Sequence, residues 1–418
     1  MTRSLIEDSG ASAATIDGVA PQDSAAKMQC RVAFLTNTVP PAEKALFLAL
    51  RARFSDFHLF LSSPQETMNP SSGHWDGLHG TVQKSLRLRR QSRHPIGFST
   101  ELHWDIPWDT LIQLRRCRPD IVISAELGFR TLFAALYRVL HPTSRLIIWA
   151  PCSEHTERAR GRFRTWIRRI LLRFADAVLV NAASGRRYME WLGVAPETIF
   201  FVPRAVDLDP FAQIPLKRRL ECARRLLYVG QLIERKGVHL FLQALNRWAR
   251  LHREHRIEFW LQGDGPMRSE LEALPMASSV SVRFLGSAPN TEIPKIYGQA
   301  GILAFPTLAD EWGLPVNEAM AAGLPVLGSR YSEAVEEMVE TDVTGWKFRA
   351  DHAGETDEAI DRAMRVSDEQ LDLMRSAARE RAAAFAPEKI ADRVVSAARF
   401  VMPPAVGKRE DGAMVEGN

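Results

Sequence analysis

Residues 306–326 read PTLADEWGLPVNEAMAAGLPV, and this stretch places two carboxylates, Asp310 and Glu318, on either side of a Gly-Leu-Pro turn. The apolar runs ILAFP just before it and LPVLGS at its end are typical of short buried strands. Pro315 fits the first turn of a helix, where its missing N–H is tolerated. We therefore predict strand, loop, helix and strand, with Asp310 in the loop, Glu318 one turn inside the helix, and both facing one pocket.

The same alternation extends in both directions and predicts an α/β protein. Short apolar runs recur at CRVAFLT, FHLFLS, IVISA, RLIIWA and AVLVN, and then at RLLYVG, IEFWLQ and VRFLG, with helix-like segments between them. Strands that alternate with helices form parallel sheets covered on both faces. The run TIFFVPRAVDLDPFAQIPLKRR separates the two series, is rich in proline and is interpreted as a linker.

This organisation predicts two Rossmann-like, doubly wound domains in tandem. A length of 418 residues agrees with it, because one ordinary core does not grow that large. The predicted parts are a disordered tail at 1–27, an N-terminal domain at 28–205, a linker at 206–218, a C-terminal domain at 219–386, a helix at 387–402 after a break at Pro387, and a disordered tail at 403–418.

Composition narrows the class of protein. The apolar fraction of 46% and the charged fraction of 25% are those of a globular protein. The four cysteines form no paired C-x-x-C unit, so neither a disulfide framework nor a zinc site is indicated. No run approaches the ~20 apolar residues that span a bilayer, and the N-terminal segment lacks the apolar run of a signal peptide. We expect a cytoplasmic protein without a metal ion.

Two further loops are expected at strand ends in the second series, where open α/β sheets bind their ligands. In YVGQLIERKG, Gly230 closes a strand, and Arg235 and Lys236 precede the next helix, whose N-terminus favours phosphate. In LQGDGP, Gly263 and Gly265 permit close approach of the backbone. Each motif alone is weak evidence, since such a turn usually just connects a strand to a helix.

Together these motifs resemble those of the retaining GT-B glycosyltransferases of family 4, also called glycosyl transferases group 1. The resemblance rests on G-x-x-x-x-x-K-G from Gly230, the GDGP turn from Gly263, FLG at 284–286, and the acidic element from Asp310 to Glu318 followed by AMAAGLPV. The N-terminal half matches only through ADAVLVN and VPRAVDLD. The resemblance implies two facing domains, with the C-terminal helix crossing back to the N-terminal domain.

The resemblance also implies roles for residues. Glu318 would hold the ribose hydroxyls, Asp310 the sugar hydroxyls, and Lys236 the diphosphate. This chain departs from the family at Asp310, usually a glutamate, and at Gln231, often an arginine. Taken with the loop positions, the full candidate set is Asp310 and His155 as catalytic residues, and Gly230, Gln231, Arg235, Lys236, Gly263, Gly265, Leu285, Trp312, Gly313, Leu314 and Glu318 as donor-binding residues, with the N–H groups of the last loop facing an anion. His155 enters this set through its place after a strand, not through the resemblance.

The expected activity is transfer of a sugar from a nucleoside diphosphate sugar to a hydroxyl group, with retention at the anomeric carbon and no cofactor. The acceptor would be a polysaccharide, a lipid-linked glycan or another glycoconjugate precursor. The alternative is a degenerate GT-B protein that binds a nucleotide sugar as a regulatory or assembly subunit. A nicotinamide-dependent oxidoreductase is disfavoured, because NTVPPAEK after the first strand has no glycine.

The N-terminal half offers weaker signals. His155 follows the strand RLIIWA and is expected at the cleft, as are Glu154 and Glu126, although a surface histidine without a role is as common.

The segment ERARGRFRTWIRRILLRFAD, with arginines from Arg158 to Arg173, has two interpretations. A helix with one basic and one apolar face suits an anionic membrane surface, here the inner face of the cell membrane. A helix with this spacing more often packs its apolar face on its own sheet, and we favour this interpretation for the apolar residues. They are Phe163, Trp166, Ile167, Ile170, Leu171 and Phe174. A nucleic-acid partner is not expected, because no known binding module accompanies the charge.

Overall fold

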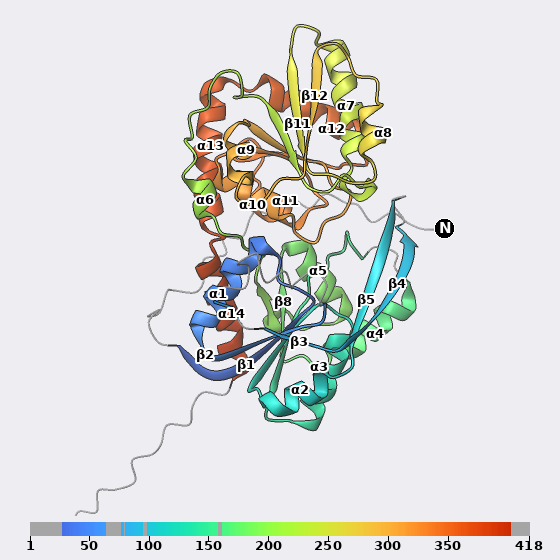
Figure 1. Ribbon diagram of the computed structural model, residues 1–418, viewed down its shortest axis with the longest axis vertical. Coiled ribbons are helices and arrows are strands. Elements are labelled where there is room, and N and C mark those ends of the chain that lie inside the picture. The colour runs from blue at the N-terminus through green and yellow to red at the C-terminus, as the bar shows by residue number, and fades with distance from the viewer. Residues whose placement is uncertain (1–26, 64–76, 79, 95–97, 158–160, 403–418) are drawn as a thin grey trace, which may run out of the picture.

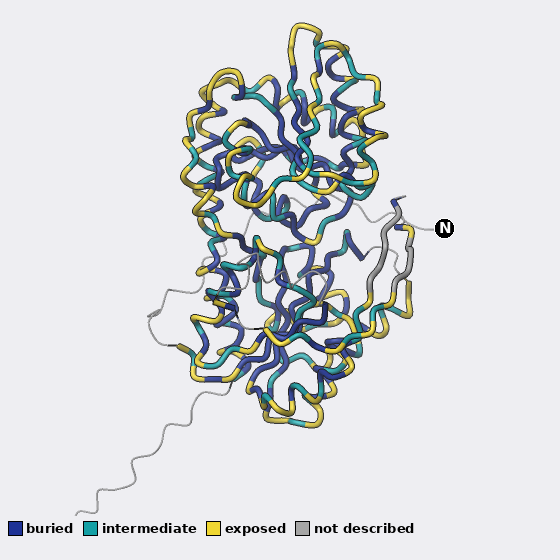
Figure 2. Tube along the Cα trace, viewed as in Figure 1, coloured by how far each residue is buried: buried dark blue, intermediate teal, exposed yellow. Residues whose placement is uncertain are grey.

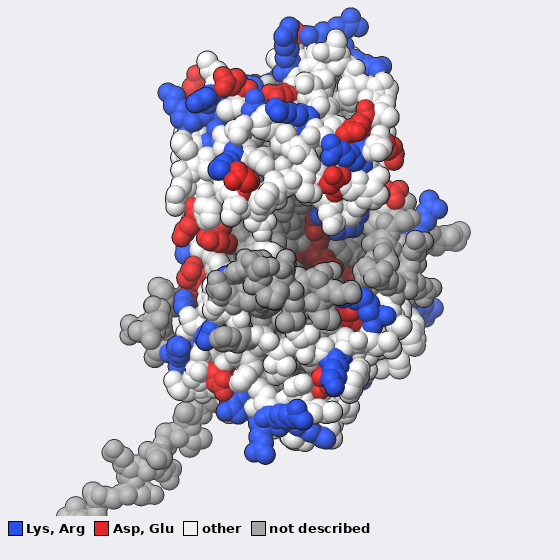
Figure 3. All heavy atoms as spheres, viewed as in Figure 1, with Lys and Arg blue, Asp and Glu red and all other residues white. Residues whose placement is uncertain are grey.

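The computed structural model describes residues 27–63, 77–78, 80–94, 98–157 and 161–402. The tails predicted at 1–27 and 403–418 therefore lie outside the described residues, apart from residue 27. The described chain folds into two α/β domains (Figure 1). The space-filling view shows a hollow between them (Figure 3). The strands at the centre of each domain are buried, and exposed residues gather on the outer loops and helices (Figure 2).

The N-terminal domain is a seven-stranded parallel sheet in the order β3-β2-β1-β6-β7-β8-β9. Its strands are β1 (Met28–Thr36), β2 (Phe54–Leu61), β3 (Gly80–Val82), β6 (Ile121–Ala125), β7 (Arg145–Trp149), β8 (Ala177–Val180) and β9 (Ile199–Phe201). The central strands are mostly apolar and buried, as expected where helices cover both faces of a sheet. Those helices include α1 (Lys44–Arg53), α2 (Thr110–Cys117), α3 (Phe129–Leu140), α4 (Arg162–Leu172) and α5 (Ala183–Leu192).

A two-stranded antiparallel hairpin, which the sequence analysis missed, interrupts this domain. It consists of β4 (Ser85–Arg93) and β5 (Ser99–Pro107), with Leu88 opposite Trp104. The hairpin projects from the N-terminal domain beside the hollow, toward the C-terminal domain (Figure 1). Just before β5, Phe98 is buried within the apolar core of the C-terminal domain. The hairpin therefore joins the two domains on one side.

The C-terminal domain is a six-stranded parallel sheet in the order β12-β11-β10-β13-β14-β15. Its strands are β10 (Leu226–Val229), β11 (Ile257–Gln262), β12 (Val280–Gly286), β13 (Ile302–Phe305), β14 (Val326–Ser329) and β15 (Gly345–Phe348). Its helices are η4 (Glu234–Lys236), α7 (Val238–Leu251), α8 (Arg268–Glu272), α9 (Ile293–Gly298), α10 (Leu314–Ala321), α11 (Glu333–Met338), α12 (Ala353–Arg365) and α13 (Asp368–Ala383). Two doubly wound domains were predicted, and the structure confirms them.

The chain crosses between the domains twice. The Pro-rich run interpreted as a linker begins with β9, the edge strand of the N-terminal sheet, and includes the short helix α6 (Asp209–Ala212). The second crossing leads to α14 (Pro387–Val401), which lies among elements of the N-terminal domain (Figure 1). There Ile390, Val394 and Ala398 are fully buried in the core that β1 and α1 also form. The predicted return of the C-terminal helix is confirmed.

Helix α4 differs from the interpretation favoured for it. Phe163, Trp166, Ile167 and the following Phe174 are exposed, so the prediction that they pack on the sheet was wrong for them, although Leu171 is buried.

Arg168 is also not part of a solvated basic face. It is buried, lies 2.6 Å from Glu157 in an ion pair, and donates a hydrogen bond to Tyr188. Arg158 lies outside the described residues. Within the part of the chain that the structure describes, no helix is long and apolar enough to cross a bilayer.

Candidate active site

Asp310 lies in the loop between β13 and α10, as predicted, at the centre of a group of charges. Its carboxylate pairs with the ammonium of Lys236 and lies 3.7 Å from the guanidinium of Arg235. Both cations come from η4, which follows β10, the neighbouring strand of the sheet. Arg235 also donates a hydrogen bond to the carbonyl of Ala309. The structure therefore brings Arg235, Lys236 and Asp310 together at the carboxyl edge of the sheet.

The charges within this group are mutually dependent. Burial raises the pKa of the Asp310 carboxyl, but the nearby charges of Lys236 and Arg235 outweigh burial and leave that pKa below its ordinary value. Burial lowers the pKa of Lys236, an effect that the Asp310 charge partly offsets. Asp310 is thus a carboxylate held in place by two cations. A buried ion of one sign alone would be costly here.

Glu318 lies one turn inside α10, also as predicted, but its partner was not foreseen. The hydroxyl of Tyr297, on α9, donates a hydrogen bond of 2.8 Å to Oε2 of Glu318. Burial raises the pKa of Glu318 to about 7, and the Tyr297 hydrogen bond acts in the opposite direction. Tyr297 is fully buried, so this hydrogen bond fixes the orientation of the Glu318 carboxyl.

The predicted glycine loops pack backbone against backbone. The N–H of Gly230 donates to the carbonyl of Gln262, and the N–H of Leu232 donates to that of Asp264. A Cβ atom at Gly263, whose φ is +130°, would overlap the carbonyl of Gly230, and one at Gly265 would overlap that of Leu232. The glycines are therefore required for the loops after β10 and β11 to lie this close.

In the loop before α10, Trp312 forms hydrogen bonds within the protein that the sequence did not predict. The backbone N–H of Trp312 donates to the Asp310 carboxylate, so this donor is not available for the anion that was predicted there. The Trp312 side chain is buried and donates to Asn317. Gly313, with φ +114°, precedes Leu314, the first residue of α10.

Two other predicted donor-binding residues follow β10 and end β12. Gln231 is exposed in the loop after β10, and its carbonyl accepts a hydrogen bond of 2.7 Å from Tyr228. Leu285 is partly buried at the end of β12, beside an apolar cluster of the C-terminal domain. Their roles in donor binding stay predictions.

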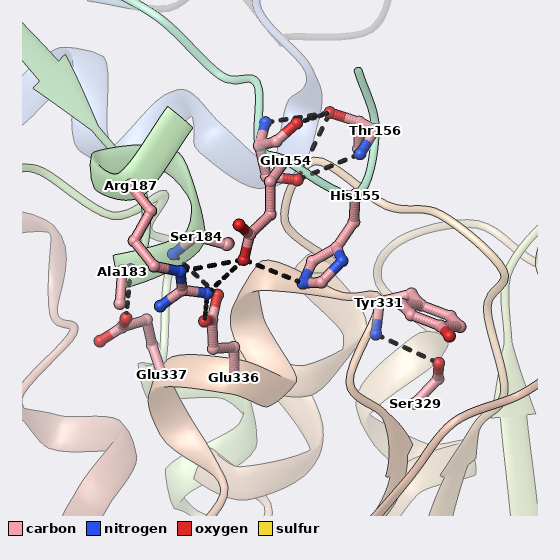
Figure 4. A network of polar contacts seen from close by, with 11 residues as sticks. Glu154, His155, Thr156, Ala183, Ser184, Arg187, Ser329, Tyr331, Glu336 and Glu337 are labelled. Carbon is pink, nitrogen blue, oxygen red and sulfur yellow. Dashed lines mark hydrogen bonds and ion pairs between the residues drawn. The ribbon is translucent and has the colours of Figure 1, made fainter. Parts of the chain in front are cut away.

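His155 lies where the two domains meet. Its ring centroid is 5.4 Å from that of Tyr331, which follows β14 in the C-terminal domain. Beside it, Arg187 of α5 pairs with Glu154 and with Glu336 of α11, so an ion-pair network crosses from one domain to the other (Figure 4). A role for His155 in the reaction stays a prediction.

Helices α5 and α11 also meet directly at this network. Ser184 donates its backbone N–H to Glu336, and Ala183 donates its own to Glu337 (Figure 4). Acidic side chains at a helix N-terminus are favoured by the helix dipole. The C-terminal domain thus caps a helix of the N-terminal domain.

Sequence reasoning missed a second group of polar residues at this boundary. Asn181, directly after β8, accepts a hydrogen bond from Trp149 and donates to the Glu311 carbonyl and to Oε2 of Glu333. Glu333 is buried, and burial raises its pKa well above the ordinary value. Asn181 stood in the quoted run AVLVN, where a polar residue ending a buried strand was a usable signal.

Glu311 follows Asp310 in the loop before α10 and is exposed. The surrounding protein, and then the charges of Glu126 and Glu157, raise its pKa to about 7. Across from it, Glu126 adopts the left-handed conformation, with φ of 76°, and pairs with Arg130 at 2.7 Å. Acidic side chains are visible inside the hollow between the domains (Figure 3).

No metal site was predicted, and that expectation stays a prediction. Among the described residues, no group of three or more His, Cys, Asp or Glu side chains is arranged to hold an ion.

Comparison with known families accounts for both halves of the chain. Residues 223–365 match the family described as glycosyl transferases group 1, and residues 45–210 match glycosyltransferase family 4. The two matches adjoin near the predicted linker, and the first contains the Asp310 and Glu318 sites.

Curated relatives align over part of their length. A 2-deoxystreptamine glucosyltransferase of Streptomyces kanamyceticus is 31% identical over 46% of this chain and 51% of its own. The amylovoran biosynthesis glycosyltransferase AmsK of Erwinia amylovora is 28% identical over 37% of this chain and 39% of its own. The chain therefore spans about half the length, or less, of these relatives.

Solved structures align over nearly the whole described chain. The galactosyltransferase WaaB of the lipopolysaccharide outer core, without ligand, has a TM-score of 0.67 at 14% identity and covers 90% of this chain and 100% of its own. HepE of Anabaena, in complex with UDP and glucose, has a TM-score of 0.65 at 14% identity, over 88% of this chain and 99% of its own. At this identity the likeness shows the fold alone.

Proposed function

The chain belongs to the GT-B glycosyltransferases of the family 4 type, and from this premise we propose that it transfers a sugar from a nucleoside diphosphate sugar to a hydroxyl group of a glycan or lipid-linked acceptor, with retention. One observation carries the proposal: Asp310, Lys236 and Arg235 form a partly buried charged group at the carboxyl edge of the C-terminal sheet. A nucleotide sugar is the donor class that the family implies, and the HepE structure contains UDP and glucose.

The residues of this group have separate tasks in the proposal. The donor diphosphate binds Lys236 and Arg235, which stabilise the charge that develops on the departing diphosphate. Asp310 orients these cations and accepts hydrogen bonds from the sugar hydroxyls. Glu318, held by Tyr297, accepts hydrogen bonds from the ribose. The close backbone of the Gly230 and Gly263 loops lets the phosphates approach the sheet edge.

The test is a calorimetric screen of nucleoside diphosphate sugars against the whole chain, followed by assay of donor hydrolysis and product anomer. We expect one donor to bind, and Glu318→Gln to weaken its binding about 10- to 100-fold through loss of a charge-assisted hydrogen bond. The control is Glu369→Gln, an exposed acid at the start of α13.

The alternative of a non-catalytic subunit makes a different prediction. It would show donor binding that Glu318→Gln weakens, but no hydrolysis or transfer with any acceptor. Absence of donor binding by wild type, or equal binding by Glu318→Gln, would contradict the assigned site.

A further inference from the structure

The N-terminal domain exposes apolar stripes on two neighbouring helices, α3 and α4. A helix normally turns its apolar stripe toward the core. Here the stripes face solvent, and the side chains are 38 to 73% exposed. Spacings of three and four residues place each set on one side of its helix. We call them the apolar face: Phe129, Leu132, Leu136, Val139 and Leu140 on α3, and Phe163, Trp166 and Ile167 on α4.

The surface continues beyond the two helices. Helix α3 contacts α2, α4 and strand β5. On the hairpin, Leu88 and Trp104 are cross-strand neighbours and both are exposed, as is Leu86 on the same side of β4. On α2, Ile112 is exposed too. Single exposed apolar side chains are normal, but an extended group marks an interaction site.

The charge on these helices is of one sign. The sequences of α2, α3 and α4 are TLIQLRRC, FRTLFAALYRVL and RFRTWIRRILL, and none contains aspartate or glutamate. Exposed arginines accompany the apolar residues: Arg115, Arg116, Arg162, Arg169 and Arg173. The surface therefore combines large apolar side chains with positive charge.

Exposed apolar side chains together with arginines favour one kind of partner for this surface over another. A second copy of the chain docked face to face would bring arginines of both copies together. A bilayer with anionic headgroups would cover the apolar side chains and neutralise the arginines at once. We propose that the apolar face docks on the surface of an anionic membrane, without a spanning segment.

A cavity connects this face to the boundary between the domains. It lies between α4 and α5, with a volume of about 1040 Å³, and its lining includes Phe163 and Trp166 of the apolar face. The lining also includes Glu154 and Arg187, and Arg187 pairs with Glu336 of the other domain. If the proposed transferase function holds, an acceptor anchored in the membrane reaches the cleft through this cavity.

The test is co-sedimentation of the whole chain with vesicles. One set contains phosphatidylcholine alone, and the other contains equal parts of phosphatidylcholine and phosphatidylglycerol, each at low and high salt. We expect binding to the anionic vesicles that weakens as salt rises. Leu132→Asp with Leu136→Asp should reduce binding on the order of 100-fold, because two apolar side chains can no longer enter the interface. The matched control is Leu251→Asp with Leu373→Asp, two exposed leucines of the C-terminal domain.

A second variant covers the case in which the aspartates disturb folding. Arg162→Gln with Arg173→Gln should weaken binding roughly 30-fold, at about 1 kcal/mol for each basic residue. The control is Arg250→Gln with Arg253→Gln, two exposed arginines in the last turn of α7 and just after it. Equal recovery from both vesicle types would overturn the proposal. So would a dimer in solution that the Leu132→Asp, Leu136→Asp variant dissociates. Donor calorimetry on the same samples separates this outcome from failure of the proposed transferase function.

Discussion

The two domains share a strand order but leave different surfaces exposed. Among the described residues, twenty large apolar side chains are exposed, and fifteen of them lie between Leu86 and Trp191 in the N-terminal domain. In the C-terminal domain, by contrast, the charged residues of the candidate active site are partly enclosed by the protein. These are Lys236, Asp310 and Glu318, at the edge of the sheet. One domain is suited to enclose a small polar ligand, and the other to meet an extended apolar partner.

The difference shows what the fold leaves undetermined. A doubly wound sheet dictates which helix faces must be apolar toward the strands, and places ligand loops at the strand ends. It does not dictate the outer faces of the helices. Function can therefore be added independently at the strand-end loops and on the outer faces of the helices. Variants that affect one of these two regions and spare the other test whether the regions act independently.

The largest expected effect comes from Asp310→Asn. The change leaves the largely enclosed ammonium of Lys236 without its counter-charge, and we expect the free energy of unfolding to fall by about 3 kcal/mol. Transfer should fall on the order of 100-fold or more, because the cations lose their orientation. Vesicle binding should not change. Chemical denaturation, the transfer assay and co-sedimentation measure the three quantities, and a parallel loss of vesicle binding would contradict the separation of the domains.

A double variant distinguishes stability from chemistry at the same position. Asp310→Asn with Lys236→Met removes both charges, so stability should recover to within about 1 kcal/mol of wild type. Transfer should remain lost. Recovered transfer would show that the pair serves the fold rather than the donor.

An intermediate effect on the free energy of unfolding is expected when the pH changes, because Glu318 titrates. Its pKa is about 7 in the folded protein and 4.5 ordinarily, so between these values the native state holds a proton that the unfolded chain has released. The contribution of Glu318 to stability therefore falls as pH rises from about 5 to 8, by about 2 kcal/mol. Glu318→Gln lacks this dependence. The test is the difference in unfolding free energy between wild type and variant across that range, and curves that stay parallel would contradict the assignment.

The smallest effect is expected at the contact between the domains. Arg187 is half exposed, so its pairs with Glu154 and Glu336 should contribute less than about 1 kcal/mol. Arg187→Gln should barely change the unfolding free energy but should allow the domains to separate slightly, as high salt should in wild type. Small-angle scattering measures this separation. A loss of stability as large as that of Asp310→Asn would show instead that the domains fold as one unit.

The sequence predicted the C-terminal domain and the positions of its charged residues well, because the relevant signals are local. Apolar runs mark buried parallel strands, and loops at the ends of neighbouring strands meet at one edge. Tyr297 was missed, because its bond to Glu318 joins residues 21 positions apart on different helices. The hairpin was missed although SLRLRRQSR does alternate in its first residues.

Which face of a helix points toward the core was harder to predict from the sequence. Periodicity tells which side chains share a face but not whether that face points inward. On α3 the buried side consists of Arg130, Thr131, Ala134, Ala135 and Tyr137, which is less apolar than the exposed side. On α4 the buried side includes Arg168, whose partner Glu157 lies before the helix. On α3 the usual rule would have assigned the wrong face to the core, and on α4 it fails for Phe163, Trp166 and Ile167.

The return of α14 makes the N-terminal domain discontinuous along the chain. Its core is completed by side chains such as Ile390 and Val394, which the ribosome adds only after the entire C-terminal domain. Residues 28–205 released alone would expose the surface that α14 covers, whereas the apolar core of the C-terminal domain uses Phe385, just after α13, and no residue of α14. During synthesis, the half that begins first is therefore the half that is finished last.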